Sequence, residues 1–331
     1  MAEDRLRWGL LGTARINRRL VPALRASAGN RLVAVASRDR ARAAEYATQW
    51  GIERAHGSYE ALVADPEVDV VYVPLPNHLH AEWTIRAARA GKHVLCEKPL
   101  ALTVGEVEAM AAAARESGVL VAEGFVYRHH PQTLKVKELV DGGAVGEVQL
   151  VRGSFSFTLD RPNDIRFRPD WGGGCLWDVG CYPLSFARLV LGAEPVEVVG
   201  TQVLGPSGVD ETFAGQLLFP GGVLAQVDAG FRSEPRTAAE IAGTEGTILV
   251  RQPWRPEGQP ILLTRGGETE EIAAGGGEDR FVPEIEDFRE CVRTGRPPRV
   301  SLAESRGNVA TIVALLQSAR EGRVVRLSPS S

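Results

Sequence analysis

The chain has 331 residues, a length that predicts about two domains, each large enough to bury its own hydrophobic core. Its 38 basic and 42 acidic residues give a formal net charge of -4, so we expect no nucleic-acid partner, because binding to a phosphate backbone needs a positively charged surface. Hydrophobic residues make up 44% and charged residues 24% of the chain, a composition typical of a folded globular protein and not of a disordered one.

Targeting and membrane signals are weak in this sequence. Met1–Arg5 contain no apolar core of the kind found in signal peptides, and the most apolar stretch, 175–192, is interrupted by Asp178 and Arg188. We therefore expect a cytoplasmic protein with no membrane partner. The 4 cysteines show no C-x-x-C spacing, so we interpret them as reduced structural thiols and expect no metal site.

Short apolar runs alternate with helical patterns from residue 5 to about residue 127. We expect buried strands at 6–11, 32–36, 68–74, 93–96 and 119–122, and helices at 14–26, 39–50, 77–90 and 103–117. Thr103 and Glu106 form a capping-box pattern, and Gly91 and Gly118 stand where a left-handed residue ends a helix. Continuous apolar strands that alternate with helices predict an α/β fold, a doubly wound parallel sheet with helices on both faces.

The pattern changes in the second part of the chain, where alternating sequences predominate. We expect a helix at 131–141 and strands at 145–159, 196–204, 214–231, 237–243, 247–250 and 261–264. The region 214–231 is a hairpin with its turn at 220–222, and two helices, 282–294 and 302–321, end the chain. We therefore predict two domains, a Rossmann domain over 1–125 and an α+β domain over 126–331 built on a largely antiparallel open sheet.

A glycine-containing turn joins the first expected strand to the first helix. Gly12, Ala14 and Asn17 occupy the three key positions of the G-x-G-x-x-G dinucleotide motif, of which only the first is glycine here. Such a turn brings a helix N-terminus to a pyrophosphate, so we expect dinucleotide contacts in this segment. An ordinary tight turn between a strand and a helix is the alternative.

A second feature lies about 25 residues further on, at the end of the second expected strand. A fold that selects NAD has an acidic residue there for the ribose 2′-hydroxyl, whereas this chain has Ser37-Arg38, with Arg42 one helical turn later. A guanidinium can bind a 2′-phosphate in a bidentate manner, so we predict NADP as the cofactor, with NAD as the second choice. The alternative is that Asp39 or Ser37 caps a helix and that the arginines are solvated.

Two further motifs follow later strands of the same expected sheet, at the edge where open α/β sheets bind ligands. In the segment Pro74–His80, Asn77 either contacts a nicotinamide or caps the next helix. In Glu97-Lys98-Pro99, the proline disfavours helical backbone at Lys98 and holds it extended. A positioned ammonium can lower the pKa of a nearby hydroxyl or polarise a carbonyl, although a plain surface lysine is the alternative.

A mostly apolar helical segment after Gly172-Gly173-Gly174 contains two polar side chains. Asp178 and Tyr182 are four positions apart and share one face of the expected helix, where buried polar groups need partners. A phenol beside a charged group can exchange the proton that accompanies hydride transfer to or from an alcohol. A core tyrosine bonded to a structural aspartate is the alternative.

Six motifs, taken in order, resemble those of the Gfo/Idh/MocA oxidoreductases. They are Gly9–Ile16, Ser37–Asp39, Pro76–His80, Glu97–Pro99, Tyr127–Pro131 and Asp178–Pro183. The resemblance covers nearly the whole chain. It is strongest to the branch of the NADP-dependent D-xylose dehydrogenases and dimeric dihydrodiol dehydrogenases, because Tyr182 stands where the inositol dehydrogenases and many other members have histidine.

The resemblance implies a Rossmann domain followed by a β-rich domain that supplies substrate contacts and a subunit interface. It also implies that Lys98 is catalytic, that the Lys98–Pro99 peptide bond is cis, and that Tyr182 is the acid/base. We predict cofactor contacts at Gly12, Thr13, Ala14, Arg15, Ile16, Ser37, Arg38, Arg42, Leu75, Pro76, Asn77, His80, Glu97, Lys98, Arg128 and Arg166. We predict substrate contacts at Lys98, Tyr127, Trp171, Asp178 and Tyr182.

The motifs, together with what the resemblance implies, predict an NADP(H)-dependent oxidoreductase. It would transfer a hydride between the nicotinamide and a hydroxyl or carbonyl carbon of a sugar or sugar-like polyol. Tyr182 would act as the general acid/base, Lys98 would lower its pKa, and Asp178 would orient substrate or lysine. We expect a homodimer or homotetramer that associates through the open, apolar face of the C-terminal sheet.

Two alternatives to this function stay open. One is a reductase of a keto-sugar, including a nucleotide-linked one, for which Arg166, Arg168 and Trp171 could contact a larger substrate. The other, from a different class, is a non-catalytic regulator that senses a dinucleotide. The presence of both Lys98 and Tyr182 argues against the regulator.

Overall fold

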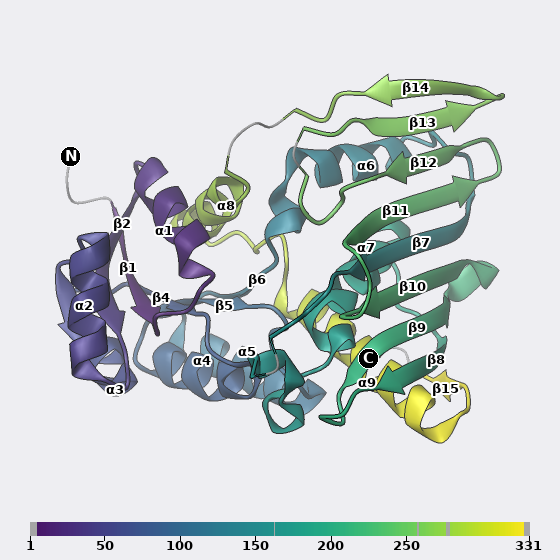
Figure 1. Ribbon diagram of the computed structural model, residues 1–331. Helices are drawn as coiled ribbons and strands as arrows, with labels where there is room; N and C mark the ends of the chain where they lie inside the picture. The colour runs from purple at the N-terminus through teal and green to yellow at the C-terminus, as the bar shows by residue number, and fades with distance from the viewer. Residues whose placement is uncertain (1–4, 162, 257, 276–278, 328–331) are drawn as a thin grey trace. The chain divides into compact units, whose positions relative to one another are not determined.

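The computed structural model describes residues 5–161, 163–256, 258–275 and 279–327 (Figure 1). The chain divides into two compact units. The first unit comprises Met1–His129 and Glu278–Arg306, and the second comprises His130–Gly277 and Gly307–Ser331. No helix among the described residues has the length and apolar character that crossing a membrane requires.

The first unit contains a six-stranded sheet in the order β3-β2-β1-β4-β5-β6, with parallel pairs throughout. Its strands are β1 (Leu6–Leu11), β2 (Asn30–Ala36), β3 (Arg54–His56), β4 (Val70–Val73), β5 (His93–Glu97) and β6 (Val121–Gly124). This is the doubly wound order of dinucleotide-binding folds, in which the chain reverses direction across the sheet between β1 and β4. The prediction of a Rossmann-type parallel sheet is confirmed.

Helices cover both faces of this sheet, with α1 and α8 on one side and α4 and α5 on the other (Figure 1). The helices of the first unit are α1 (Asn17–Ala26), α2 (Arg40–Trp50), α3 (Tyr59–Val63), α4 (His80–Arg89), α5 (Val104–Ser117) and α8 (Phe281–Thr294). The helix expected from residue 14 begins at Asn17, because Asn17 and Arg18 donate to the carbonyls of Ala14 and Arg15 in tight turns that precede the α-helix.

Helix α8 packs into the core of the first unit although it lies far along the chain. Phe281, Ile285 and Phe288 are buried in the same cluster as Trp8, and the rings of Trp8 and Phe288 are 5.4 Å apart. The sequence pattern of α8 indicated an apolar face but not which sheet would cover it. The predicted second domain, 126–331, therefore includes a helix that the structure packs with the first unit, and the boundary near residue 125 stays a prediction.

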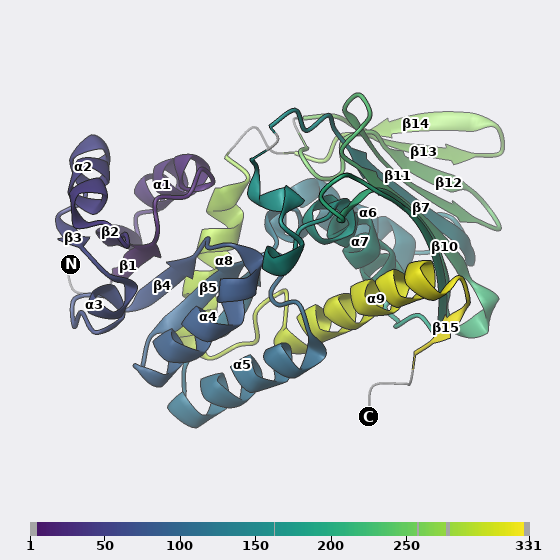
Figure 2. The same cartoon turned by 60° about the horizontal axis from the view of Figure 1, so that its bottom comes forward.

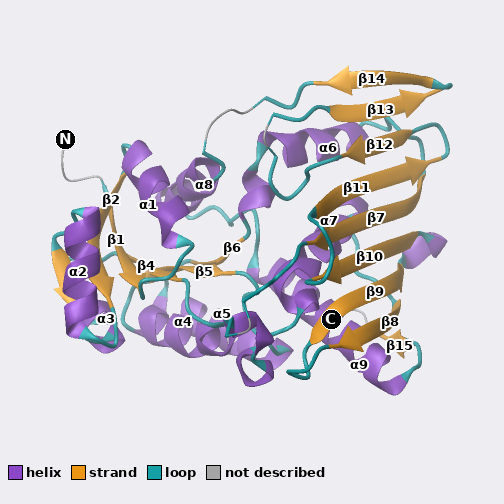
Figure 3. Cartoon of the chain, in the orientation of Figure 1, coloured by secondary structure: helices purple, strands orange, loops and turns teal. Residues whose placement is uncertain are grey.

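The second unit contains a nine-stranded sheet in the order β14-β13-β12-β11-β7-β10-β9-β8-β15 (Figure 3). Its strands are β7 (Val148–Ser156), β8 (Glu197–Leu204), β9 (Asp210–Leu218), β10 (Leu224–Gly230), β11 (Arg236–Gly243), β12 (Thr247–Val250), β13 (Ile261–Arg265), β14 (Glu268–Ile272) and β15 (Val325–Arg326). The β7–β10 pair is parallel and the other pairs are antiparallel, so the largely antiparallel open sheet is confirmed. The predicted hairpin is β9–β10, with Gly221 and Gly222 at positive φ in its turn.

One face of this sheet is covered and the other is open. The covering helices of the second unit are α6 (Pro131–Asp141), α7 (Cys181–Leu191) and residues 307–321 of α9 (Leu302–Glu321), which lie on the same side of the sheet (Figure 2). Alternate residues along the strands, such as Ala225, Val227 and Ala229 on β10, are buried under them. Gly153 lets α7 approach β7 closely, since a Cβ there would lie 2.5 Å from Cβ of Pro183.

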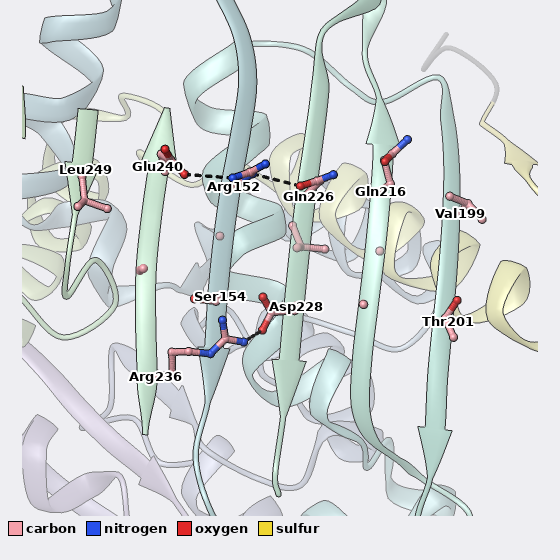
Figure 4. Close-up of a pocket in the computed structure, with 15 residues that line it drawn as sticks. Arg152, Ser154, Val199, Thr201, Gln216, Gln226, Asp228, Arg236, Glu240 and Leu249 are labelled. Atoms are coloured by element: carbon pink, nitrogen blue, oxygen red, sulfur yellow. Dashed lines mark hydrogen bonds and ion pairs between the residues drawn. The ribbon is translucent and has the colours of Figure 1, made fainter. Parts of the chain in front are cut away.

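The open face is more polar than we expected from the alternation of the strands. Arg152 on β7 donates to Gln226 on β10 at 3.1 Å and lies 3.7 Å from Glu240 on β11 (Figure 4). Arg236 and Asp228 form a second ion pair on the same face. The expectation of an apolar open face is therefore wrong, because the outward positions of the central strands carry charged and amide side chains.

The docking of α8 can be tested by removing one ring from the core of the first unit. Phe288 is 2% exposed, so Phe288→Ala should leave a cavity beside Trp8 and lower the free energy of unfolding by about 3 to 5 kcal/mol. Chemical denaturation followed by circular dichroism measures this change. Phe288→Leu should lower the free energy of unfolding by clearly less. A Phe288→Ala protein as stable as the native protein would contradict the packing of α8 on this sheet.

Candidate functional site

The turn between β1 and α1 is shaped by a glycine and an asparagine. Gly12 has φ +100°, donates its N–H to the carbonyl of Ala36 at 2.9 Å, and would place a Cβ 3.3 Å from Cδ2 of Leu75. The buried Asn17, at the third motif position, donates from Nδ2 to the carbonyl of Gly12 at 2.9 Å. An asparagine therefore closes this turn where the motif usually has glycine, and the N-terminus of α1 stays at the edge of the sheet.

The end of β2 carries the predicted ribose-binding residues. Asp39 caps α2 by accepting the N–H groups of Ala41 and Arg42, so the capping alternative describes Asp39 correctly. This cap does not use the side chains of Arg38 and Arg42, which are exposed. Asp39 therefore begins the helix, and contact of the two exposed arginines with a 2′-phosphate stays a prediction.

Tyr59, the first residue of α3, was missed by the sequence analysis. Its hydroxyl lies near the positive charges of Arg38 and Arg42. Burial raises the pKa of Tyr59, and the two arginines oppose this rise. The only signal in the sequence was Ser58, which caps α3 by accepting the N–H of Ala61, but α3 is too short to show a helical pattern.

The Glu97-Lys98-Pro99 turn at the end of β5 is held by buried polar groups. The Lys98–Pro99 peptide bond is cis, as the resemblance implied. Tyr72 on β4 donates to Oε1 of Glu97 at 2.5 Å, and Oε2 of Glu97 accepts the N–H of Lys98 at 3.3 Å. Burial, together with the negative charge of Glu97, raises the pKa of Tyr72 well above its ordinary value, so this phenol keeps its proton and acts as a hydrogen-bond donor at neutral pH.

His80 lies beneath the rim and not on it. The side chain is 1% exposed, with Nδ1 2.8 Å from the carbonyl of Pro99 and Nε2 2.7 Å from the carbonyl of Leu75. Burial lowers the pKa of this imidazole. His80, which we predicted to contact the cofactor, therefore connects the chain segments that follow β4 and β5 through its two ring nitrogens.

Further buried groups support the same rim from β6 and from the chain after it. Glu123 accepts the N–H of Leu100 at 2.9 Å and the hydroxyl of Ser305 at 2.6 Å, which anchors the residues after the cis proline. Arg128, predicted to contact the cofactor, is 4% exposed and donates to Glu304 at 2.6 Å. Tyr127, predicted to contact substrate, is fully buried with its ring 5.2 Å from that of Phe125.

In the second unit, the segment with Asp178 and Tyr182 is not one continuous α-helix. Leu176–Gly180 is π-helical and leads into α7, so the expectation of a regular helix over 175–192 is wrong. Asp210 on β9 accepts the N–H of Leu176 at 2.7 Å and lies 3.1 Å from the sulfur of Cys175. Gly180 has no side chain, which allows Ala229 and Leu176 to approach the wider turn.

Arg166 and Asp178, placed in different roles by the sequence, are partners. Nε of Arg166 donates to Asp178 at 2.6 Å and Nη1 donates to Asp164 at 3.0 Å. The two carboxylates, led by Asp178, raise the pKa of Arg166 further above its ordinary value. The guanidinium predicted to contact cofactor thus neutralises the aspartate one helical turn before Tyr182.

The ring of Tyr182 is held by aromatic neighbours. It lies 5.3 Å from the ring of Phe155 at an interplanar angle of 71° and 6.0 Å from that of Trp254. Trp171, predicted to contact substrate, is half-buried under the guanidinium of Arg168, whose Cζ is 4.9 Å from the ring centroid.

The two halves of the predicted catalytic set belong to different units. Lys98 is in the first unit, and Asp178 and Tyr182 are in the second, so the structure describes each half by itself. Among the described residues, no group of three or more histidine, cysteine, aspartate or glutamate side chains is placed to hold a metal ion.

Comparison with known proteins gives the family. A family model described as an oxidoreductase family with an NAD-binding Rossmann fold matches residues 6–125, and a model of the GFO/IDH/MocA C-terminal domain matches residues 133–249. The chain belongs to the Gfo/Idh/MocA oxidoreductase family. The resemblance drawn from the six motifs is therefore confirmed, and so is the prediction of an oxidoreductase with an NAD(P)-binding Rossmann fold.

Three relatives match along almost their whole length. The D-xylose 1-dehydrogenase (NADP(+)) 2 of Haloferax volcanii is 39% identical and covers 97% of this chain and 99% of its own. The structure of the aldose-aldose oxidoreductase from Caulobacter crescentus complexed with glycerol has a TM-score of 0.92 at 32% identity, covering 98% of this chain and 100% of that chain. The structure of the 3-ketoreductase from Actinomadura kijaniata in complex with NADP and TDP-benzene has a TM-score of 0.89 at 34% identity. The match covers 95% of this chain and 98% of that chain.

Two further structures of that ketoreductase contain single mutants, one with a tyrosine replaced by phenylalanine and one with a lysine replaced by alanine.

Proposed function

We propose that this protein is an NADP(H)-dependent oxidoreductase that interconverts a hydroxyl and a carbonyl on a sugar or sugar-like polyol. The observation that carries the proposal is the pair Ser37-Arg38 at the end of β2, with Arg42 beside it, at the position where NAD-selective folds have a carboxylate. Two exposed guanidinium groups there attract a 2′-phosphate. The D-xylose dehydrogenase relative is named for NADP(+), and the ketoreductase structure contains NADP, which supports the same cofactor here.

The residues of the first unit fit a dinucleotide. Gly12 presents bare backbone at positive φ, and the N-terminus of α1 follows it, which together suit a pyrophosphate. In this proposal the segment Gly12–Ile16 holds the pyrophosphate, and Leu75–Asn77 with Glu97-Lys98 line the same edge of the sheet. The nicotinamide ring supplies the hydride donor or acceptor when the cofactor is bound.

Tyr182 moves the proton in the proposed mechanism. During oxidation the phenolate accepts the proton of the substrate hydroxyl, and during reduction the phenol donates a proton to the carbonyl oxygen. The ammonium of Lys98 favours the phenolate and so lowers the pKa of Tyr182. The substituted tyrosine and lysine of the ketoreductase are separated by the same number of positions as Lys98 and Tyr182, which supports this pair as the catalytic one.

Asp178 has a narrower role in this scheme than the sequence predicted. Its carboxylate is already paired with Arg166, so the pair adds little net charge near Tyr182. Asp178 therefore orients Arg166 and the adjoining substrate site more readily than it orients Lys98.

A keto-sugar reductase is the second candidate within the same chemistry. The exposed guanidinium of Arg168 over Trp171 forms a flat cationic platform that suits a larger, phosphate-bearing substrate. The match to a ketoreductase solved with TDP-benzene favours this alternative. Two assays separate the candidates, one with NADPH and a nucleotide-linked keto-sugar and one with NADP⁺ and free aldoses. Turnover in the first assay alone indicates the keto-sugar reductase, and turnover in the second alone indicates the sugar dehydrogenase.

We also propose that the protein is a homo-oligomer that associates through the open face of the second unit's sheet. Its polar row of Arg152, Gln226 and Glu240 presents donors and acceptors together on neighbouring strands (Figure 4). A self-complementary surface of this kind suits an interface with two-fold symmetry.

The choice of cofactor should depend on Arg38. Arg38→Ala removes a charge-assisted hydrogen bond to the 2′-phosphate, so it should weaken NADP(H) binding roughly tenfold or more while changing NAD(H) binding much less. Titration of both reduced cofactors by nicotinamide fluorescence measures the two dissociation constants. Arg40→Ala, which removes an exposed arginine two positions away, is the matched control. Equal weakening of NADP(H) and NAD(H) binding would show that Arg38 does not bind the 2′-phosphate.

Proton transfer should depend on Tyr182 and Lys98 as a unit. Tyr182→Phe should keep NADPH binding while turnover falls by about 10² to 10⁴. Lys98→Met should move the basic-side apparent pKa of any residual activity upward, toward the ordinary phenol value near 10. The double mutant should be little slower than the slower single mutant.

The controls for this prediction are direct. Lys137→Met removes a lysine on α6 that is ion-paired with Asp141, and it should leave the pH profile unchanged. A Tyr182→Phe enzyme with full activity and an unchanged pH profile would exclude the phenol as the acid/base.

Oligomerisation of the chain should be measurable as a molar mass above that of one chain. Light scattering at micromolar concentration should give a multiple of the 35.7 kDa chain, and Arg152→Glu should reduce it, because the new carboxylate repels Glu240 and loses the bond to Gln226. Arg89→Glu, which changes an exposed arginine on α4 of the first unit, should leave the mass unchanged. A native mass equal to one chain would refute the oligomer.

A further inference from the structure

We propose that Asp210 is a positioning residue for Tyr182. It acts through the turn Leu176–Gly180, which its carboxylate holds in a π-helical form that sets the direction of the tyrosine ring. This inference rests on the proposed acid/base role of Tyr182 and deepens it, because it names the buried group that determines where the phenol lies.

The carboxylate of Asp210 is buried at the start of β9. The residue is 4% exposed, and its Oδ2 accepts the N–H of Leu176 at 2.7 Å and the thiol of Cys175 at 3.1 Å. Strands β8 and β10 pair with β9 on either side. The acceptor therefore belongs to a rigid sheet, and the groups that it binds belong to the segment that enters the turn.

Gly174 shows how closely this segment lies against the carboxylate. Its φ is +118°, and a Cβ built on it would overlap Oδ1 of Asp210. Glycine is required here both for the backbone conformation and for space. One oxygen of Asp210 thus faces bare backbone, and the other accepts hydrogen bonds from the next two residues.

The same anchor supports the charged pair that precedes Tyr182. The N–H of Gly174 donates to the carbonyl of Arg166 at 2.9 Å, and the guanidinium of Arg166 donates to Asp178 at 2.6 Å. Asp178 itself lies on the π-helical turn, and its N–H donates to the carbonyl of Gly174 at 3.1 Å. A movement of the turn away from Asp210 would therefore displace Arg166 and Asp178 together.

The form of the turn determines where the ring of Tyr182 points. A π-helical turn holds one residue more than an α-helical turn, so its relaxation to α-helix rotates the flanking side chains relative to one another by about 100°. Tyr182 comes two positions after the turn, with its ring 5.3 Å from that of Phe155. The turn joins two fixed points, Asp210 before it and the close packing of Pro183 on Gly153 after it. Release of the first point lets the turn relax, and the phenol then loses its fixed direction.

The test follows Tyr182 directly and needs no substrate. The sequence has 5 tyrosines, and Tyr182 is the one in the second unit, whereas Tyr46, Tyr59, Tyr72 and Tyr127 belong to the first. In the full-length protein labelled with fluorotyrosine, each tyrosine gives a fluorine NMR signal, and Tyr182→Phe assigns the signal of Tyr182 by removing it. The signals of the first unit serve as the internal reference.

Asp210→Ala removes the anchor, so the signal of Tyr182 should shift or broaden while the other signals stay unchanged. Asp210→Asn keeps an oxygen that can accept the N–H of Leu176, so it should largely restore the native signal. Turnover of the sugar that the native enzyme accepts should fall roughly 10- to 100-fold in Asp210→Ala and only a few-fold in Asp210→Asn. The dissociation constant of NADPH should change less than about twofold in both variants, because Gly12 and Arg38 belong to the other unit.

Glu211→Ala is the matched control. Glu211 is the next acid on β9, is 8% exposed and accepts from Nε of Arg232 at 2.5 Å, so its loss also removes a buried carboxylate from the same strand. It does not bind the turn, so the signal of Tyr182 and the turnover should stay native. Asp210→Ser, whose hydroxyl is too short to replace the carboxylate, is measured in parallel, so that the test stands where Asp210→Ala does not fold.

The outcomes separate this role from the proposed mechanism. A native Tyr182 signal in folded Asp210→Ala or Asp210→Ser would overturn the positioning role and leave the acid/base proposal standing. An equal change of the signal in Glu211→Ala would also overturn it, since that result indicates general loosening of the second unit. If the signal moves in the Asp210 variants alone but Tyr182→Phe keeps full turnover, Asp210 positions the ring and the acid/base proposal falls.

Discussion

The parallel pairing of β1 with both β2 and β4 is the constraint on which the first unit depends. Parallel strands end at the same edge of a sheet, so segments that follow β1, β2, β4 and β5 meet there although the ends of β1 and β5, Leu11 and Glu97, are 86 positions apart. Reversal of the winding between β1 and β4 sends the following helices to opposite faces, and open α/β sheets bind ligands at such a point. Gly12, Arg38, Leu75 and Lys98 share an edge for this reason and not because of any local motif.

Buried polar bonds then make that edge rigid. Tyr72 holds Glu97 from the neighbouring strand, His80 joins the carbonyls of Leu75 and Pro99, and Glu123 holds the chain after the cis proline. Each of these side chains would be costly to bury without its partner, so the bonds specify one arrangement of the rim. These bonds hold the chain on both sides of Lys98, which is what its proposed electrostatic role requires.

Sequence patterns identified the elements whose periodicity is long and missed those whose placement depends on other parts of the chain. The parallel and antiparallel sheets, the β9–β10 hairpin and the cis proline agree with expectation, whereas β3, α3, β14 and β15 have only two to five residues and show too little periodicity. The docking of α8 and the π-helical turn before α7 depend on partners distant in sequence, Trp8 and Asp210. Tyr59 was missed for the same reason, because the pairing of β3 with β2 brings it to the end of β2.

The pairing of Arg166 with Asp178 bears on how Tyr182 would titrate. An unpaired aspartate one turn away would disfavour the phenolate, and an unpaired arginine would favour it. The two charges lie 2.6 Å apart and largely cancel at the distance of the phenol. Aromatic contacts from Phe155 and Trp254 bring no charge of their own to the ring. The Arg166–Asp178 pair therefore contributes little net charge to the phenol, and in the proposed mechanism it is Lys98 that supplies the positive charge favouring the phenolate.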